Sequence, residues 1–262
     1  MTVRSIVCQF LLSFVPSPVL GGDVTPLPRR VLILVYHRFA SERADSMTVR
    51  TSTFRDQLQA IDAAGYRIAL LADVVRWHAG EAGAVPARAA AITVDDGHRS
   101  VHDVLRPNLA RHPVSVTHFI YPTAISNASC AMAWDRLRKL AGSGEFDIES
   151  HTYRHPNLAT ERARCMPDDF RRFVSWQLSC SRDRLETETG KPVRLLAWPF
   201  GIHDVETEQL AAREGCAAAF MVDAWPVRET NPPMALPRVL MTDAWGARCM
   251  DGLLCTAGGA HG

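Results

Sequence analysis

Two groups of side chains have the types and the spacing that metal-assisted hydrolysis needs. Asp95 and Asp96 are adjacent and directly follow an apolar run, and His151 and His155 lie four positions apart. Two histidines and one carboxylate form a recognised ligand set for a catalytic divalent ion, because they leave coordination positions open for water and substrate. Water bound to such an ion has a pKa of about 7, which suits hydrolysis of an amide or ester.

The local sequence patterns predict how the carboxylates and the histidines are oriented. Neighbouring residues at a strand end point in different directions, so Asp95 and Asp96 are expected to divide the work, one as general base and one as metal ligand. Positions four apart share one face of a helix, so the histidine spacing predicts a single helical turn, which Pro156 would end. The simpler alternatives are an Asp-Asp-Gly turn and a chance pair among 10 histidines.

The elements that must position these residues alternate along the chain. Helical patterns are predicted over 51–64, 71–78, 134–141, 168–189 and 204–214. Strand patterns are predicted over 31–35, 66–69, 89–94, 114–121, 146–150, 193–198 and 217–222. This alternation predicts a parallel sheet, and we expect a single α/β domain built as a distorted (β/α)7-type barrel. The carboxyl ends of barrel strands share one rim, which would bring the carboxylates, the histidines and the segment 198–201 together.

Composition excludes several other classes of protein. The chain has 262 residues and a formal net charge of +1, with 47% hydrophobic and 22% charged residues. That balance provides no electrostatic reason to bind nucleic acid or an anionic membrane. No glycine-rich phosphate-binding motif is present, which argues against a nucleotide-dependent enzyme. The length and composition are those of one globular domain.

The first 22 residues resemble a secretory signal peptide. Arg4 is followed by a mostly apolar run that is too short to span a membrane, and a Pro-Ser-Pro segment ends it. We therefore expect export to the periplasm or the extracellular space, with 23–262 as the mature domain. A cytoplasmic protein with a chance apolar start is the alternative. Cleavage would leave six of the seven cysteines, either paired or free, and no C-x-x-C motif is present.

Two ordered motifs resemble those of the polysaccharide deacetylase family, carbohydrate esterase family 4. The segment 93–97, Thr-Val-Asp-Asp-Gly, is similar to its T-F-D-D-G motif, and 150–155 is similar to its second motif, H-[ST]-x-x-H. The resemblance extends over roughly residues 31–240. It implies that Asp95 is the general base. It also implies that Asp96, His151 and His155 bind a divalent metal, for which Zn²⁺ is expected and Co²⁺, Ni²⁺ or Fe²⁺ are alternatives.

The third motif of the family is altered. The motif normally contains an arginine, and Ala197 stands at that position here, within Ala-Trp-Pro-Phe-Gly. The group that orients Asp95 is therefore not identified. This form resembles the branch that acts on poly-β-1,6-N-acetylglucosamine. It implies substrate contacts from Pro199, Phe200 and Gly201, with a backbone N–H near Phe200 stabilising the oxyanion. Asp223-Ala-Trp225 resembles the fourth motif and adds Trp225 as a substrate-binding residue.

The fifth motif, L-x-H, normally supplies the general acid, and it is missing. The matching stretch, 236–240, contains no histidine. His37, His98 and His203 lie beside predicted rim segments, but each is expected to be a solvated or supporting residue rather than the acid. The proton donor for the leaving amine is therefore not assigned.

These observations lead to one main hypothesis and two alternatives. The resemblance implies a metal-dependent hydrolase that removes N-acetyl groups from N-acetylglucosamine-containing polysaccharide and releases acetate. N-acetylated polysaccharide or oligosaccharide is the expected partner, together with exopolysaccharide machinery. The missing arginine and L-x-H motif would suit a non-catalytic carbohydrate-binding or assembly protein, although the intact Asp95 argues against this. An amidase that acts on a small molecule would use the same fold.

Overall fold

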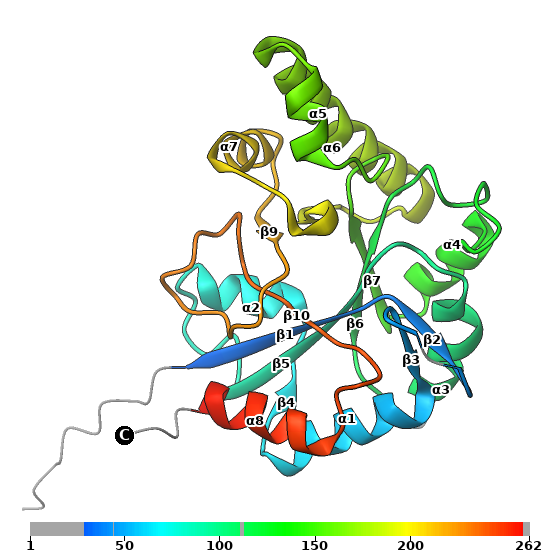
Figure 1. Ribbon diagram of the computed structural model, residues 1–262, viewed down its shortest axis with the longest axis vertical. Coiled ribbons are helices and arrows are strands. Elements are labelled where there is room, and N and C mark those ends of the chain that lie inside the picture. The colour runs from blue at the N-terminus through cyan, green and yellow to red at the C-terminus, as the bar shows by residue number, and fades with distance from the viewer. Residues whose placement is uncertain (1–28, 44, 111–112, 259–262) are drawn as a thin grey trace, which may run out of the picture.

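A parallel sheet forms the centre of the computed structural model, which describes residues 29–43, 45–110 and 113–258 (Figure 1). Within the described residues the sheet has eight strands in the order β10-β1-β5-β6-β7-β8-β9, with β4 paired to β5. The strands are β1 (Arg30–Tyr36), β4 (Arg67–Ile68), β5 (Arg88–Val94), β6 (Val116–Ile120), β7 (Phe146–Ser150), β8 (Leu195–Ala197), β9 (Ala218–Phe220) and β10 (Val239–Leu240). The predicted signal peptide, 1–22, lies outside the described residues.

The sheet curls so that its two ends approach each other. The Leu236 N–H donates to Ala219 O at 2.9 Å, next to a parallel bridge between Leu236 and Phe220 of β9. A few residues later, Val239 of β10 pairs with Leu34 of β1. The segment 236–240 therefore connects β9, the last strand of the curl, to β1. The parallel strands and their covering helices confirm the predicted distorted α/β barrel.

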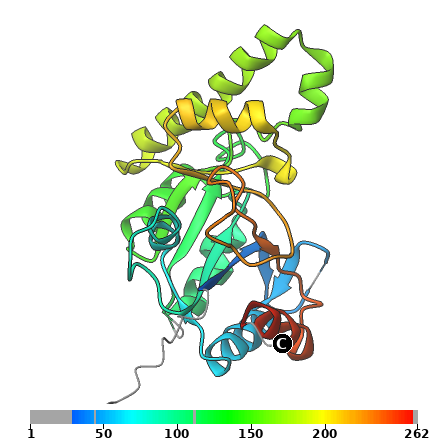
Figure 2. The ribbon, with the colours of Figure 1, turned by 90° about the vertical axis from the view of Figure 1, so that its left-hand side faces the viewer.

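Helices cover the outer face of the curl in two groups (Figure 2). At one end lie the helices α5 (Leu158–Arg164), α6 (Pro167–Thr189) and α7 (Val205–Arg213). At the other end α1 (Thr51–Ala63) packs against α8 (Ala247–Gly258). The remaining helices are α2 (Leu71–His78), the π-helical turn η1 (Val101–Leu105), α3 (Arg106–Leu109) and α4 (Trp134–Gly142). A short ribbon of β2 (Arg38–Ala40) and β3 (Thr48–Arg50) follows β1.

The inner face of the curl is apolar up to the carboxyl ends of the strands. The rings of Phe119 on β6 and Phe220 on β9 lie 5.6 Å apart although two strands separate them in the sheet, so both point into the concave side. Alternate residues of β1 and β5 and one face of α2 join the same buried cluster. This packing provides a rigid floor beneath the rim.

Strands β7 and β8 share only one registered pair, and a carboxylate completes their contact. The Glu149 Oε2 accepts the N–H groups of Arg194 at 2.9 Å and Leu195 at 2.7 Å. Glu149 is buried, and this burial raises the pKa of its carboxyl to about 8, although both N–H donors favour the charged form. We therefore expect Glu149 to be protonated in the folded protein at neutral pH.

The raised pKa of Glu149 predicts a pH-dependent stability. Between about pH 4.3 and pH 8 the folded protein holds a proton that the unfolded chain releases, so stability falls as pH rises through this window. Glu149→Gln keeps an acceptor but does not titrate. Urea unfolding should show wild type losing on the order of 3 kcal/mol relative to this variant between pH 5 and pH 8. Parallel stability curves for the two proteins would contradict the assignment.

Two further features bear on the expectations from sequence. Five cysteines within the described residues are free thiols, namely Cys130, Cys165, Cys180, Cys216 and Cys249. Burial raises the pKa of the Cys216 thiol to about 12, which keeps it protonated.

None of the helices in the described part of the chain is long and apolar enough to cross a membrane.

Candidate active site

The carboxyl ends of β5 and β7 bring the four predicted catalytic and metal-binding residues together. Asp96 Oδ1 lies 3.7 Å from His151 Nε2 and 3.6 Å from His155 Nε2. The three ligand atoms of this cluster all lie within 4.8 Å of one another. Asp95 is buried directly beside it, with Oδ2 3.9 Å from His151 Nε2. Residues more than 50 positions apart thus meet at one point of the rim, as the strand topology predicted.

The two motif loops use left-handed backbone conformations rather than helix. Asp96 and Gly97 have φ values of 78° and 82°, and a Cβ added at Gly97 would lie 2.8 Å from Ile125 Cδ1. The predicted helical turn from His151 to His155 is wrong, because φ is 62° at Thr152 and 55° at His155. These residues reverse the chain instead. Non-glycine residues in this region are strained, which is common where side chains must converge on a site.

Helix α6 supports the loop after β7. The Gln177 Oε1 accepts the backbone N–H groups of Tyr153 at 3.1 Å and Arg154 at 2.8 Å. Ser150 Oγ donates to Ser181 Oγ at 2.8 Å. Both α6 residues are buried, so the orientation of the histidine loop is set by the packing of this helix against β7.

The histidine and carboxylate donors fit a divalent metal ion. His151 Nδ1 lies 2.8 Å from the carbonyl oxygen of Ala197, which places the proton on Nδ1 and leaves the Nε2 lone pair facing Asp96. Burial lowers the pKa of His151 to about 3 and also lowers that of His155, so both rings are neutral, as ligands must be. The separations of 3.6–3.7 Å exceed hydrogen-bond length. They are close to the roughly 3.4 Å expected between two ligands of a tetrahedral ion with bonds of about 2.1 Å.

Arg238 orients Asp95, which sequence reasoning left unassigned. Its guanidinium donates from Nη1 to Oδ1 at 2.8 Å and from Nη2 to Oδ2 at 2.7 Å, so the pair is bidentate. A third bond reaches Thr93 Oγ1 at 3.1 Å, and the guanidinium lies 5.1 Å from the Phe119 ring centroid. Arg238 is fully buried inside the curl. The residue enters from the segment just before β10, which no predicted strand covered.

The contact with Arg238 also determines the charge of Asp95. Burial alone would raise the pKa of this carboxyl, but the adjacent Arg238 and His151 outweigh it and hold the pKa far below its usual value. Asp95 therefore stays ionised across the physiological pH range. Asp95 is thus an ionised carboxylate, held rigidly beside the cluster, that can accept a proton from a nearby donor.

His37 is a further imidazole near this cluster, outside the predicted ligand set. It follows β1, whose last residue, Tyr36, accepts the Asp95 N–H at 2.9 Å. Burial lowers the pKa of His37, while the charges of Asp95 and Asp96 oppose the change. Within the described residues its buried Nδ1 has no hydrogen-bond partner. His98 and His203 are engaged elsewhere, with Ser100 Oγ and Glu208 Oε1 respectively, each at 2.8 Å.

The segment after β8 contributes an exposed aromatic ring to the rim. Phe200 has φ of 57° and is 62% exposed, and its ring centroid lies 4.6 Å from that of His155. Pro199 beside it is buried. Gly201 has φ of 69°, and an added Cβ would lie 3.0 Å from the Val222 nitrogen, so a side chain would be strained there.

Trp225 is not part of this cluster. It lies on the loop between β9 and β10, where the Val227 N–H donates to Val31 O at 2.8 Å near the start of β1. Asp95 bonds instead to Tyr36 at the other end of that strand, about 16 Å along it. The predicted substrate-binding residues thus fall into two places, Phe200 with its neighbours at the rim and Trp225 at the loop.

Comparison with solved structures places this arrangement among known folds. IcaB from Ammonifex degensii superposes with a TM-score of 0.76 and 20% sequence identity, covering 86% of this chain and 97% of that one. A Streptococcus pyogenes deacetylase, PplD, solved in complex with acetate, gives a TM-score of 0.74 and 19% identity, covering 87% of this chain and 99% of that one. At these identities the similarity establishes the fold.

Curated relatives and a family model agree with the fold. Poly-β-1,6-N-acetyl-D-glucosamine N-deacetylase from Staphylococcus epidermidis is 21% identical over 207 residues, covering 78% of this chain and 71% of the relative. The enzyme of the same name from Staphylococcus aureus is 18% identical, covering 80% and 73%. The polysaccharide deacetylase family model matches residues 82–219, which include both acidic residues, both histidines and Phe200. Since this match spans more than half of the chain, the protein belongs to the polysaccharide deacetylase family.

Proposed function

We propose that this protein is a metal-dependent hydrolase that removes N-acetyl groups from poly-β-1,6-N-acetylglucosamine and releases acetate. The observation that carries the proposal is the buried, arginine-paired Asp95 beside a cluster of one carboxylate and two neutral histidines. A binding protein has no need of an ionised base at such a cluster. The names of the curated relatives support the polymer and its linkage.

Asp96, His151 and His155 would hold the metal ion. Their nitrogen and oxygen donors suit Zn²⁺, and Co²⁺, Ni²⁺ or Fe²⁺ are alternatives that the same donors accept. When bound, the ion would lower the pKa of its water to about 7 and polarise the acetyl carbonyl. The Ala197 carbonyl, through His151 Nδ1, keeps one ligand in the required tautomer.

The chain's own residues move the protons. Asp95 takes a proton from the attacking water at a carboxylate oxygen, while Arg238 holds both oxygens in place. The new bond joins the water oxygen to the acetyl carbon, and the carbon–nitrogen bond then breaks. A backbone N–H near Phe200 would stabilise the oxyanion, and the exposed Phe200 ring together with Pro199 and Gly201 would contact the sugar.

His37 is our candidate for the group that delivers a proton to the leaving amine. Because burial lowers its pKa, it must first gain that proton, and the negative charges of Asp95 and Asp96 favour its protonated form. Four described histidines interact electrostatically with Asp95, namely His37, His118, His151 and His155. Two of these belong to the ligand set, and His118 is wholly enclosed in the core. His37 alone of the four combines partial exposure with a place outside the ligand set.

Replacing His37 by glutamine tests this role. We expect kcat for deacetylation to fall by about 10²-fold, because a positioned acid contributes roughly that much or more, while KM stays similar. Metal content, measured by mass spectrometry, should be unchanged because His37 lies outside the ligand set. His203→Gln is the matched control and should retain wild-type kinetics. A kcat close to wild type in His37→Gln would remove His37 from the mechanism.

The location of activity follows from the same proposal. The curated relatives are named as poly-β-1,6-N-acetyl-D-glucosamine N-deacetylases, and residues 1–22 resemble a secretory signal peptide. We infer that the protein is exported and acts in the periplasm or outside the cell, in contact with the exopolysaccharide machinery. N-terminal sequencing of the mature protein from a secreting host would test this, with cleavage expected near residue 22.

Acetate release tests the function directly. Purified protein is incubated with poly-β-1,6-N-acetylglucosamine, chitin oligomers, peptidoglycan and monomeric N-acetylglucosamine in parallel, with and without a chelator. We expect release from the β-1,6-linked polymer that the chelator abolishes and added Zn²⁺ restores. Release from monomers alone would indicate a small-molecule amidase. No release by metal-loaded protein from any substrate would support a binding protein instead.

A further inference from the structure

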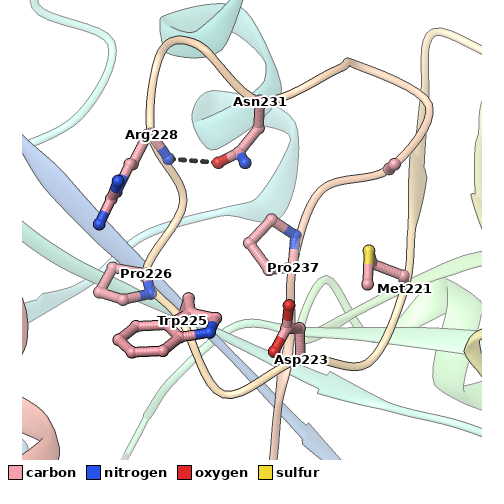
Figure 3. A pocket seen from close by; sticks show the side chains of 8 residues that line it. Met221, Asp223, Trp225, Pro226, Arg228, Asn231 and Pro237 are labelled. Carbon is pink, nitrogen blue, oxygen red and sulfur yellow. Dashed lines mark hydrogen bonds between the residues drawn. The ribbon is translucent and has the colours of Figure 1, made fainter.

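The loop between β9 and β10 forms a second pocket, away from the catalytic cluster (Figure 3). Its volume is about 270 Å³. The lining residues are Met221, Asp223, Trp225, Pro226, Arg228, Asn231, Ala235 and Pro237. We propose that this loop pocket binds one hexosamine residue of the polymer outside the catalytic centre, an inference that rests on the proposed function for the identity of the polymer.

The size and lining of the pocket favour a single sugar ring. Small-molecule sites usually enclose about 300–1,000 Å³, so this pocket lies just below that range and suits one ring better than a longer segment. Trp225 is 54% exposed and presents its indole at the pocket wall in Figure 3. An exposed indole offers a flat apolar face to the C–H groups of a sugar, and the prolines and Met221 extend the apolar wall.

Polar groups of both kinds complement this apolar surface. Asp223 supplies carboxylate oxygens that accept hydrogen bonds from hydroxyl groups, and Arg228 supplies donors for hydroxyl or acetamide oxygens. Asp223 Oδ1 accepts the Ala224 N–H at 2.7 Å, which leaves Oδ2 for a ligand, and neither side chain makes an ion pair with any described residue. Because their charges cancel, the pocket favours a neutral polar ligand over an anion or a cation.

Hydrogen bonds within the loop and to its neighbours hold it in this shape. Its Asn231 accepts the Arg228 N–H at 2.6 Å through Oδ1, and its carbonyl oxygen lies 3.0 Å from His78 Nε2 on α2. Val227 is bonded to β1, and the Asp223 N–H donates to Arg238 O at 2.9 Å. A pre-formed pocket loses little conformational entropy when it binds a ligand.

The segment just before β10 connects the loop pocket to the catalytic centre. Pro237 lines the pocket, and the next residue is Arg238, which holds Asp95. Gly201 at the rim also lies against Val222 on the same loop. The Trp225 side of the pocket lies near the start of β1, about 16 Å along that strand from the residue that bonds to Asp95, so the proposal requires a chain longer than a disaccharide to occupy both places.

Kinetics with long and short substrates test the proposal. Trp225→Ala and Arg228→Ala are compared with wild type on poly-β-1,6-N-acetylglucosamine and on the β-1,6-linked N-acetylglucosamine disaccharide. We expect KM for the polymer to rise about tenfold in each variant, with kcat unchanged. Both constants for the disaccharide should stay at wild-type values. Arg172→Ala, an exposed arginine change on α6, is the matched control and should alter neither substrate.

The outcomes separate this inference from the proposed function. An unchanged KM for the polymer in both variants, or an equal loss on the disaccharide, would overturn the loop pocket as a sugar site. Binding of wild type and Trp225→Ala to the polymer, measured by co-sedimentation on ice, provides a readout that needs no turnover. Weaker binding of the variant would support the pocket even if wild type released no acetate, in which case only the proposed function would fall.

Discussion

Replacing Asp95 by asparagine is expected to lower kcat for acetate release by about 10³- to 10⁴-fold while the metal stays bound. Asparagine cannot accept a proton from the attacking water, so the base is lost. The metal-binding atoms belong to Asp96, His151 and His155, which this change does not remove. Initial rates of acetate release and metal content by mass spectrometry would be measured on the same preparations.

A matched change elsewhere separates the loss of the base from general damage. Asp56 is exposed on α1 and belongs to neither the cluster nor its supporting contacts, so Asp56→Asn should keep wild-type kinetics. If Asp95→Asn retained kcat within tenfold of wild type, another group would have to be the base. Retained polymer binding together with the lost kcat would also distinguish an enzyme from a carbohydrate-binding protein on the same fold.

Much of the scaffold could be predicted because its elements carry strong local signals. The helix predicted over 71–78 matches α2, and the strand predicted over 146–150 matches β7. In contrast, α5, α8 and β10 were missed. β10 has only two residues, and its register is determined by β1 rather than by its own sequence. Such short elements depend on tertiary pairing, which local periodicity does not report.

The residues of the site that carry local sequence signals could also be predicted, and those that depend on tertiary closure could not. Asp95, Asp96, His151 and His155 belong to short motifs, and strand topology alone places such motifs on one rim. Arg238 lies 143 positions from its partner, and only the closure of the curl brings its side chain beneath Asp95. His37 was placed beside the rim because it directly follows a predicted strand, but sequence alone did not distinguish it from His98 and His203, which bond to other residues in the fold.

Replacing Arg238 by methionine is expected to reduce both stability and activity. The change keeps much of the apolar volume but leaves Asp95 buried without a partner, which should cost about 3–5 kcal/mol of unfolding free energy at pH 7. The pKa of Asp95 should rise, because its burial is then opposed by fewer positive charges. Urea unfolding would report the stability loss, and kcat should fall because the base is neither held nor fully ionised.

The pH dependence and a double variant make this prediction specific. In wild type the lowered pKa of Asp95 stabilises the fold above about pH 4, the value for the unfolded chain, and this contribution is lost as pH falls further. The stability gap between wild type and Arg238→Met should therefore narrow in acid. Adding Asp95→Asn to Arg238→Met removes the unpaired charge, so the double variant should be more stable than Arg238→Met alone, yet inactive. A double variant no more stable than Arg238→Met would mean that packing of the arginine, rather than its charge, stabilises this part of the fold.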